Sequence, residues 1–395
     1  MQYHNLKKFF ALSTFELFSF ILTLLPTSVF LLINLKMKRP VYITRIVTEA
    51  IGHFAFETDL KLAKMKNYGG SKLLVINYGK FSNFKLKKKF IESGNVIFAP
   101  KIIHISLNFL LNNVVAFRKL IPFEEINFFD PFKYENTPPQ INLNEQERSL
   151  CVSSIKKNAP FLLGKPLVLV CIRDSKYDEV MNRDPENRLS YRNSNPDNFI
   201  EISKYLTHLG YAVIRMGRST NTKLSKEHSE FLFDYAYSNL ASELMDLYLF
   251  SECDFVISTE FGLDELGTLF RKPVLIVNLL PLYSVRISRF RSIILPKVLI
   301  DLNTHQPLSL KEIASRNISN AWSTYDYLNA NVGILENTPF AILEFIKEAL
   351  QVLNSNTVNN YYSDEETKNL SVILPVWWPE FRIPVIGKNW VNLGV

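Results

Sequence analysis

The chain has few of the residues that build disulfide or metal frameworks. It holds only three cysteines in 395 residues, and Cys151, Cys171 and Cys253 show no paired spacing. Cys171 and Cys253 stand within or beside apolar runs, which indicates buried free thiols in a reducing compartment. The same spacing argues against a zinc site. Internal repeats and low-complexity tracts are also absent, which excludes repeat architectures.

Composition favours a two-domain globular protein. A length of 395 residues predicts two domains, and a hydrophobic content of 47% is enough for sizeable cores. The net charge of +7 fits a membrane surface, nucleic acid or phosphorylated substrates, and charge alone does not choose among them. The basic residues are not interleaved with aromatic residues along one face, so no nucleic-acid partner is expected.

Residues 1–39 are expected to form a membrane-associated hydrophobic helix. Residues 17–35 are apolar apart from a few hydroxyl and amide side chains, and they include Pro26. This length is close to the ~20 residues that span a bilayer. Basic residues flank the run on both sides, and no small-residue cleavage site follows it. We favour a helix lying in the cytoplasmic leaflet; a single span and a buried core helix are the alternatives.

Residues 40–140 are expected to form a first parallel-sheet domain. Short apolar runs alternate here with helical patterns, which is typical of strand–helix–strand crossovers. Residues 44–53 are interpreted as the loop after the first strand, and residues 136–148 as a linker. The expected strands are 41–43, 73–76 and 96–98, and the expected helices are 54–66 and 85–92.

Residues 150–353 are expected to form a second domain of the same kind, followed by a tail at 354–395. The runs are rich in Val and Ile and bounded by turn residues, as in strands buried on both faces. A strong amphipathic helix is predicted over 339–353, and residues 354–369 are expected to be exposed. The expected strands are 167–172, 211–214, 254–258 and 274–278, with helices near 199–206, 240–249 and 263–270.

Two arginines follow the first two strands of this second domain. Arg173 and Arg215 come at the ends of their runs, where open α/β sheets place ligands. Two guanidinium groups at one edge indicate an anionic ligand. The alternative is a structural role, in which the arginines pair with Asp174, Asp197 or Glu265. Arg192 and Asn193 lie between the two strands and are interpreted either as ligand contacts or as part of a helix cap.

A third feature is the turn after the strand predicted at 254–258. Thr259 and Gly262 precede a predicted helix, whose first amides would point at an anion at the positive end of the helix dipole. Glu265 stands one turn into that helix, where a carboxylate accepts hydrogen bonds from sugar hydroxyls. The plainer alternative is a tight turn that requires a glycine.

In combination, these motifs resemble a bacterial glycosyltransferase family associated with surface-polysaccharide biosynthesis. The resemblance rests on an Arg-Asp-x-x-Tyr element ending at Tyr177, a Tyr-Arg-Asn-Ser element ending at Ser194 and an Arg-Met-Gly element ending at Gly217. It is strongest over residues 165–280. It implies an α/β fold of two Rossmann-like domains facing a cleft, as in the GT-B architecture. Glu260 departs from the small or neutral residue expected at its position.

The resemblance implies transfer of a sugar, of the hexosyl type (EC 2.4), from a nucleotide-sugar donor to a surface-glycan or lipid-linked acceptor. The second domain would bind the donor at the inner-membrane surface, on its cytoplasmic face. The implied donor and phosphate contacts are Arg173, Tyr177, Arg192, Asn193, Arg215, Gly217, Thr259, Gly262 and Glu265.

A general base must take the proton of the acceptor hydroxyl. His53 and Glu49, near the end of the first strand, are the candidates, with Asp59 behind them. No Asp-x-Asp element is present, so metal-independent, inverting chemistry is expected, and no cofactor is expected beyond the nucleotide-sugar substrate. A nucleotide-sugar 2-epimerase and a non-catalytic polysaccharide assembly factor are the alternatives.

Overall fold

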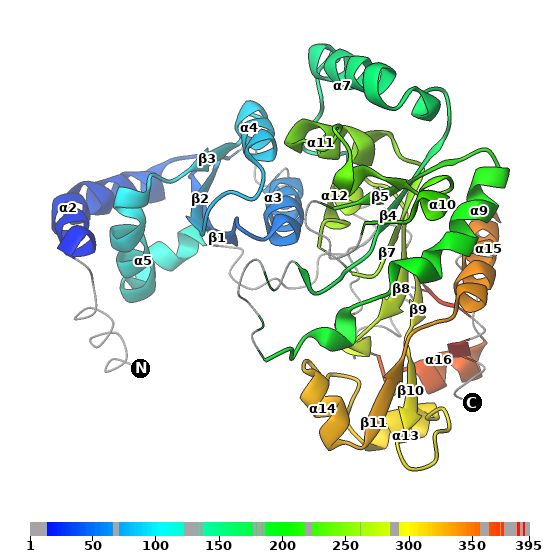
Figure 1. The fold of residues 1–395 in the computed structure, drawn as a ribbon. Coiled ribbons are helices and arrows are strands. Elements are labelled where there is room, and N and C mark those ends of the chain that lie inside the picture. The colour runs from blue at the N-terminus through cyan, green and yellow to red at the C-terminus, as the bar shows by residue number, and fades with distance from the viewer. Residues whose placement is uncertain are drawn as a thin grey trace. The chain divides into compact units, whose positions relative to one another are not determined.

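A computed structural model describes most of the chain (Figure 1). The residues described are 14–65, 71–121, 134, 137–176, 179, 184, 186–217, 223–260, 262–284, 292–355, 363–371, 373–374, 385–387 and 390–391. They divide between two compact units, which we call unit 1 (Met1–Asn127 and Pro139–Asn142) and unit 2 (Phe128–Pro138 and Leu143–Val395). Each unit is an α/β structure with a parallel sheet, as the sequence predicts, and an apolar helix stands near the N-terminus. The facing cleft stays a prediction.

Unit 1 is built on a three-stranded parallel sheet in the order β1-β2-β3. In register, Ile43 lies beside Leu74, and Val75 lies beside Phe98. The strands read as apolar runs because helices cover both faces of the sheet. The elements of unit 1 are α2 (Thr14–Lys36), β1 (Tyr42–Val47), α3 (Ile51–Met65), β2 (Leu73–Tyr78), α4 (Phe84–Glu92), β3 (Val96–Phe98) and α5 (His104–Asn113).

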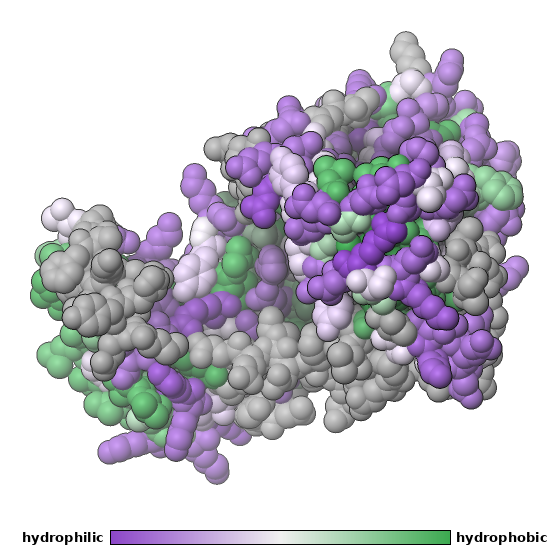
Figure 2. All heavy atoms as spheres, turned by 90° about the horizontal axis from the view of Figure 1, so that it is seen from below, coloured by the Kyte–Doolittle hydropathy of each residue, from purple (hydrophilic) through white to green (hydrophobic). Residues whose placement is uncertain are grey.

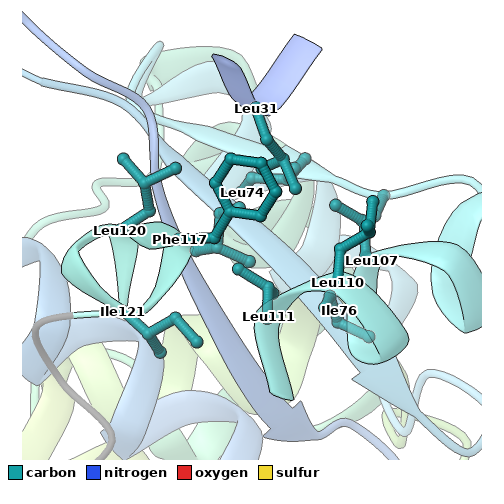
Figure 3. Packing of buried hydrophobic residues seen from close by; sticks show 11 residues of the cluster. Leu31, Leu74, Ile76, Leu107, Leu110, Leu111, Phe117, Leu120 and Ile121 are labelled. Atoms are coloured by element: carbon teal, nitrogen blue, oxygen red, sulfur yellow. The ribbon is translucent and has the colours of Figure 1, made fainter. Parts of the chain in front are cut away.

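Helices α2 and α5 form one covering layer, and α3 and α4 form the other (Figure 1). Figure 3 shows the core under α2 and α5, where Leu31 of α2 meets Leu74 and Ile76 of β2 and Leu107 of α5. On the opposite face, Phe54 of α3 contacts the aromatic rings around β3. Alternation along β1 and β2 sends successive side chains to these two layers. Helix α2 is therefore part of the core of unit 1.

By length and composition, α2 is long and apolar enough to cross a membrane. Residues Glu16–Lys36 have a mean hydropathy of 2.0, and 28% of the most apolar window is buried. In the part of the chain that the structure describes, no other helix meets this criterion.

The prediction of a loop over residues 44–53 was wrong. Strand β1 continues to Val47, and α3 begins at Ile51, so only residues 48–50 form a turn. The apolar pattern is interrupted at Thr44 and Arg45, which hid the second half of the strand. Arg45 has polar partners, since it donates to Asn108 and Asn112 of α5.

Unit 2 holds a seven-stranded sheet in the order β12-β9-β8-β7-β4-β5-β6, with every pair parallel. The chain runs outward from β4 through β5 to β6, then returns to β7 on the other side of β4. This is the doubly wound order, and its topological switch point lies between β4 and β7. The strands are β4 (Leu167–Cys171), β5 (Ala212–Met216), β6 (Phe233–Asp234), β7 (Phe255–Ser258), β8 (Val274–Leu279), β9 (Ile293–Pro296) and β12 (Val385–Ile386).

Helices pack on both faces of this sheet. Helices α9 and α15 lie together on one face and α11 and α12 on the other (Figure 1). A separate antiparallel pair, β10 with β11, adjoins the sheet. The remaining elements are α7 (Glu145–Asn158), α9 (Ile200–His208), α10 (Lys226–Ser229), α11 (Glu243–Glu252), α12 (Glu265–Leu269), β10 (Val298–Asp301), α13 (Leu310–Ser315), α14 (Thr324–Asn329), β11 (Val332–Leu335), α15 (Pro339–Ser355) and α16 (Asp364–Leu370).

Two polar stretches are more ordered than their composition indicates. The end of the predicted linker begins α7, where Asn144 and Glu147 form a reciprocal capping box. The stretch expected to be exposed contains α16, in which Thr367 is buried. Strand β12 then joins the large sheet beside β9.

Cys171 and Cys253 are free and buried, as predicted, and Cys151 is free and buried as well. Burial raises the pKa of Cys151 to about 11 and that of Cys253 to about 12. Both groups therefore stay protonated thiols at neutral pH, a poorly reactive state.

Candidate functional site

The carboxyl edge of β4 and β7 holds the first group of candidate residues. The backbone N–H of Arg173 donates to the Thr259 hydroxyl at 2.8 Å, so the two strand ends are joined directly at the switch point. The Thr259 N–H in turn donates to Cys171. Open α/β sheets bind ligands outside the strand ends at such a point. Both residues lie where the sequence predicts, although the Thr259 hydroxyl already has a protein partner.

Arg215 lies inside strand β5 instead of following it. It pairs in register with Val170 of β4 and Asp234 of β6, and its side chain is fully buried. Its guanidinium lies 3.6 Å from the Asp234 carboxylate and 4.0 Å from that of Asp174. The predicted strand end was therefore two residues too early, because Arg215 interrupts the apolar run. These ion pairs favour the structural role among the two alternatives.

Arg192 is the more accessible guanidinium, with its side chain 25% exposed. It donates to the Glu260 carbonyl oxygen at 3.0 Å and lies 3.7 Å from the Glu260 carboxylate. Glu260 has a φ of 59°, in the left-handed region that few non-glycine residues adopt. The departure from a neutral residue at this position therefore supplies a partner for Arg192.

A network of hydrogen bonds holds the segment that contains Asn193 and Ser194. The Ser194 N–H donates to the Arg173 carbonyl oxygen, and the Asn278 amide donates to the Ser194 hydroxyl at 3.1 Å. Asn278 is buried at the end of β8 with a φ of 61°, and it also accepts from Asn337. These bonds draw the ends of β4 and β8 together around the Tyr-Arg-Asn-Ser element.

Lys297, directly after β9, was missed by the sequence analysis. Its side chain is buried and donates to the Asn193 carbonyl oxygen at 2.5 Å. Burial lowers the pKa of Lys297 from its ordinary value of 10.5 to about 8, and the Glu336 carboxylate partly offsets this effect. The available signal was the apolar run 293–295 followed by Pro296 and Lys297, a fifth strand with a cation at its end.

The depressed pKa of Lys297 makes stability depend on pH. Below pH 8 the lysine is charged in both folded and unfolded chains, so its burial destabilises the fold throughout that range. Between pH 8 and 10.5 the unfolded chain binds more protons, so stability rises with pH. Relative to a Lys297→Met variant, the wild type is expected to gain roughly 2–3 kcal/mol in free energy of unfolding over this window. Urea unfolding at pH 7, 8.5 and 10 checks this; parallel curves would contradict it.

The turn after β7 is less favourable for phosphate than its sequence indicates. Helix α12 is five residues long, Glu265–Leu269, instead of the predicted 263–270, so it offers little helix dipole. Gly262 adopts a φ of 77°, as a tight turn requires. Asp264 and Glu265 are both buried there, and Asp264 accepts from the Ser258 hydroxyl at 2.7 Å. Carboxylates of this kind suit hydroxyl donors better than anions.

Several buried polar atoms of the same edge have no hydrogen-bond partner among the described residues. They are the Tyr191 hydroxyl, Nε of Arg192 and Oδ1 of Asn193. Burial raises the pKa of Tyr191 to about 12, so the hydroxyl is a neutral donor at physiological pH. Buried polar groups are usually satisfied, and a polyhydroxylated ligand supplies both donors and acceptors.

Two of the predicted donor contacts are not placed against this group. Tyr177 lies outside the described residues. Gly217 directly follows β5, is buried, and has a φ of 136°. Among the described residues, no three His, Cys, Asp or Glu side chains are grouped to hold a metal ion. Metal independence stays a prediction.

The candidate base residues follow β1 in unit 1, Glu49 in the turn and His53 and Asp59 in α3. Glu49 is in the turn before α3, and its carboxylate lies against Gly79, whose φ of 76° favours glycine. His53 is in the first turn of α3, and its Nδ1 lies 2.6 Å from Oε1 of Glu57. Asp59 instead faces the chain entering unit 2, because it accepts from the Gln140 N–H. A histidine beside an orienting carboxylate is the arrangement of a general base.

Comparisons with known proteins give distant likenesses only. No family model matches the chain, and no curated protein matches it. The structure of the E. coli ADP-heptose lipopolysaccharide heptosyltransferase II matches with 11% identity and a TM-score of 0.41, over 80% of this chain and all of that one.

Two further solved structures are similar at the same level. A glycosyl transferase of family 9 from Veillonella parvula matches with 11% identity and a TM-score of 0.45, over 80% of this chain and 98% of that one. The dodecameric iron-containing heptosyltransferase TibC, in complex with ADP-D-beta-D-heptose, matches with 14% identity and a TM-score of 0.34, over 64% of this chain and 61% of that one. At TM-scores below 0.5, these likenesses assign no function.

Proposed function

We propose that the protein is a metal-independent, inverting glycosyltransferase that moves a sugar from a nucleotide-sugar to a surface-glycan or lipid-linked acceptor at the cytoplasmic face of the inner membrane. The observation that carries the proposal is the switch point of unit 2. Arg173 and Thr259 meet there, and Arg192 and Lys297 lie in or against the adjoining Tyr-Arg-Asn-Ser segment. Doubly wound sheets bind ligands at such a switch point, and cationic side chains there suit the phosphates of a nucleotide.

In the proposed reaction, the acceptor oxygen attacks the anomeric carbon while the bond from that carbon to the diphosphate breaks. The electron pair leaves with the nucleoside diphosphate, and the acceptor proton passes to a base in unit 1. Arg173 and Arg192 stabilise the charge that develops on the diphosphate, since planar guanidinium groups bind phosphate oxygens in pairs. The buried Glu265 carboxylate and the Tyr191 hydroxyl are suited to the hydroxyls of the donor.

A thermal-shift screen of the detergent-purified chain against ADP, UDP, GDP, CDP, TDP and CMP tests this proposal. We expect one nucleotide to stabilise the protein by about 2.7 kcal/mol at a hundred times its Kd. Arg192→Gln is expected to weaken the binding of that nucleotide roughly tenfold, because a charge-assisted contact is lost. Arg148→Gln is the matched control, since Arg148 pairs with Glu252 on the surface between α7 and α11.

The screen does not use Arg215→Ala, because Arg215 stabilises the fold through buried ion pairs and its loss would confuse binding with unfolding. If no nucleotide shifts the folded wild type, the transferase proposal fails and a non-catalytic assembly factor replaces it. If Arg148→Gln weakens binding as much as Arg192→Gln, the donor site does not lie at this edge.

A further inference from the structure

Helix α2 has its polar side toward the protein and its apolar side outward. The residues that it buries against unit 1 are largely polar, and they are Ser19, Phe20, Thr23, Thr27, Leu31 and Asn34. Apart from Thr14, Pro26 and Lys36, its exposed residues are large and apolar, and they are Leu17, Phe18, Ile21, Leu22, Leu25, Val29, Phe30, Leu32 and Ile33. A surface helix of a protein surrounded by water has the reverse pattern.

Specific contacts fix this orientation along the length of the helix. The Thr23 hydroxyl lies 2.7 Å from that of Ser106 in α5. At the other end, the Asn34 side chain both donates to and accepts from the backbone of Val41, at 2.8 and 2.7 Å. Leu31 is fully buried between these points. Rotation of α2 to hide its apolar side would break all of these contacts.

We infer that the outward side of α2 is a docking surface for an anionic lipid bilayer, with the helix parallel to the membrane plane. Leu25 and Ile21 are 73% and 69% exposed at its centre, and Phe109 of α5 and Val115 extend it beside α2. Hydrophobic side chains gather at this end of unit 1 in Figure 2. Amphipathic helices bury such a side in the headgroup boundary. The inference makes the proposed membrane location specific and is independent of the transfer reaction.

The neighbours of α2 oppose a crossing orientation. The Thr23 hydroxyl, near the middle of the helix, lies 3.4 Å from the carbonyl oxygen of Ile102. The neighbouring residue Lys101 is therefore level with the middle of α2. In a crossing helix this level would be the bilayer centre. Lys101 and the single 3₁₀ turn Lys101–Ile103, which has no side-chain cap at its start, would then be in hydrocarbon, where charges and unsatisfied backbone groups are costly. A helix lying flat leaves both at the headgroup level.

The charges around this surface complement an anionic membrane. Residues 14–39 and 101–121 hold Glu16 as their only acidic residue. Lysines and arginines next to an anionic leaflet each strengthen binding. The basic residues of α4 belong to the opposite layer of unit 1 and are not part of this surface (Figure 1). The contributing residues, all exposed, are Lys36, Lys38, Arg39, Lys101, Arg118 and Lys119.

Vesicle flotation of the full chain tests the surface. The chain is transferred from detergent to vesicles of phosphatidylethanolamine with phosphatidylglycerol, or of phosphatidylcholine alone. We expect flotation with the anionic vesicles and weaker flotation with the neutral ones or in high salt. Leu25→Glu is expected to lower vesicle binding about tenfold or more. Phe340→Glu is the matched control, because Phe340 of α15 is 71% exposed on unit 2.

A labelling experiment tests the orientation. The native thiols are buried and do not interfere with labelling. Single cysteines are introduced before and after α2 in the sequence, as Gln2→Cys and Lys38→Cys. A membrane-impermeant maleimide is expected to label both in inverted membrane vesicles and neither in intact spheroplasts. Labelling of the two positions from opposite sides would establish a span and overturn the inference.

Two other results overturn the inference: flotation of Leu25→Glu equal to that of wild type, and no flotation of folded wild type. Nucleotide shifts are measured on the same samples. A wild type that floats but binds no nucleotide leaves the docking surface standing and removes the transferase proposal.

Discussion

Replacement of Arg215 by methionine is expected to destabilise unit 2 by about 3–5 kcal/mol. The side chain is fully buried between β4 and β6, and its guanidinium faces Asp234 at 3.6 Å and Asp174 at 4.0 Å. Methionine fills much of the volume but leaves two carboxylates without the cation between them. Asp234 also accepts from the Leu224 N–H, so its disturbance extends to that segment. Urea unfolding followed by circular dichroism measures the loss.

Two comparisons separate the ion pair from simple loss of an arginine. Arg148→Met removes a partly exposed pair with Glu252 and is expected to change stability by at most about 1 kcal/mol. Adding Asp234→Asn to Arg215→Met removes one of the stranded charges, so part of the lost stability is expected to return. An Arg215→Met protein as stable as Arg148→Met would show that the pair contributes little.

This result bears on how the arginines are interpreted from sequence. Arg173 and Arg215 look equivalent in the chain, because each ends an apolar run. The structure separates them, since Arg173 follows β4 whereas Arg215 lies within β5. A one-dimensional pattern cannot reveal the acids on neighbouring strands, because Asp234 is brought to Arg215 only by the β5–β6 register.

Much of the fold could be predicted from local patterns. Runs of Val, Ile and Leu located β2, β3, β4, β7 and β8 to within two residues at either end, because buried parallel strands exclude polar residues. The same logic failed where a polar residue belongs in a strand, as at Arg45 of β1. It also missed β9, whose four residues are too few to stand out before Pro296 and Lys297.

The site was predicted only in part, because its supports are long-range. Asn278 connects to Ser194 and Asn337, which are 84 and 59 positions away in the sequence. Its backbone conformation, at a φ of 61°, gives no signal in a single sequence beyond the identity of the residue. In α2, hydropathy predicted an apolar helix. Which side of the helix faces the protein depends on contacts with Ser106 of α5 and Val41 before β1.

Replacement of His53 by glutamine is expected to reduce kcat about 10²–10⁴-fold with little change in thermal stability. The imidazole is 54% exposed, so its removal leaves no cavity, and the pair with Glu57 at i,i+4 contributes at most about 0.5 kcal/mol. Its Nδ1 lies 2.6 Å from the Glu57 carboxylate, which leaves Nε2 to accept a proton from the acceptor. Sugar transfer from the nucleotide-sugar found in the screen is the measurement.

Glu57 and Glu49 distinguish this assignment from its competitor. Glu57→Gln keeps a hydrogen-bonding group near His53 but removes the charge that fixes its tautomer, so kcat is expected to fall about tenfold or more while KM is unchanged. Glu49→Gln is expected to have a smaller effect, because the Glu49 carboxylate lies against Gly79. If Glu49→Gln abolishes transfer and His53→Gln leaves it within about twofold of wild type, the base is Glu49. The β1–α3 turn then acts through its carboxylate, and the His53–Glu57 pair is structural.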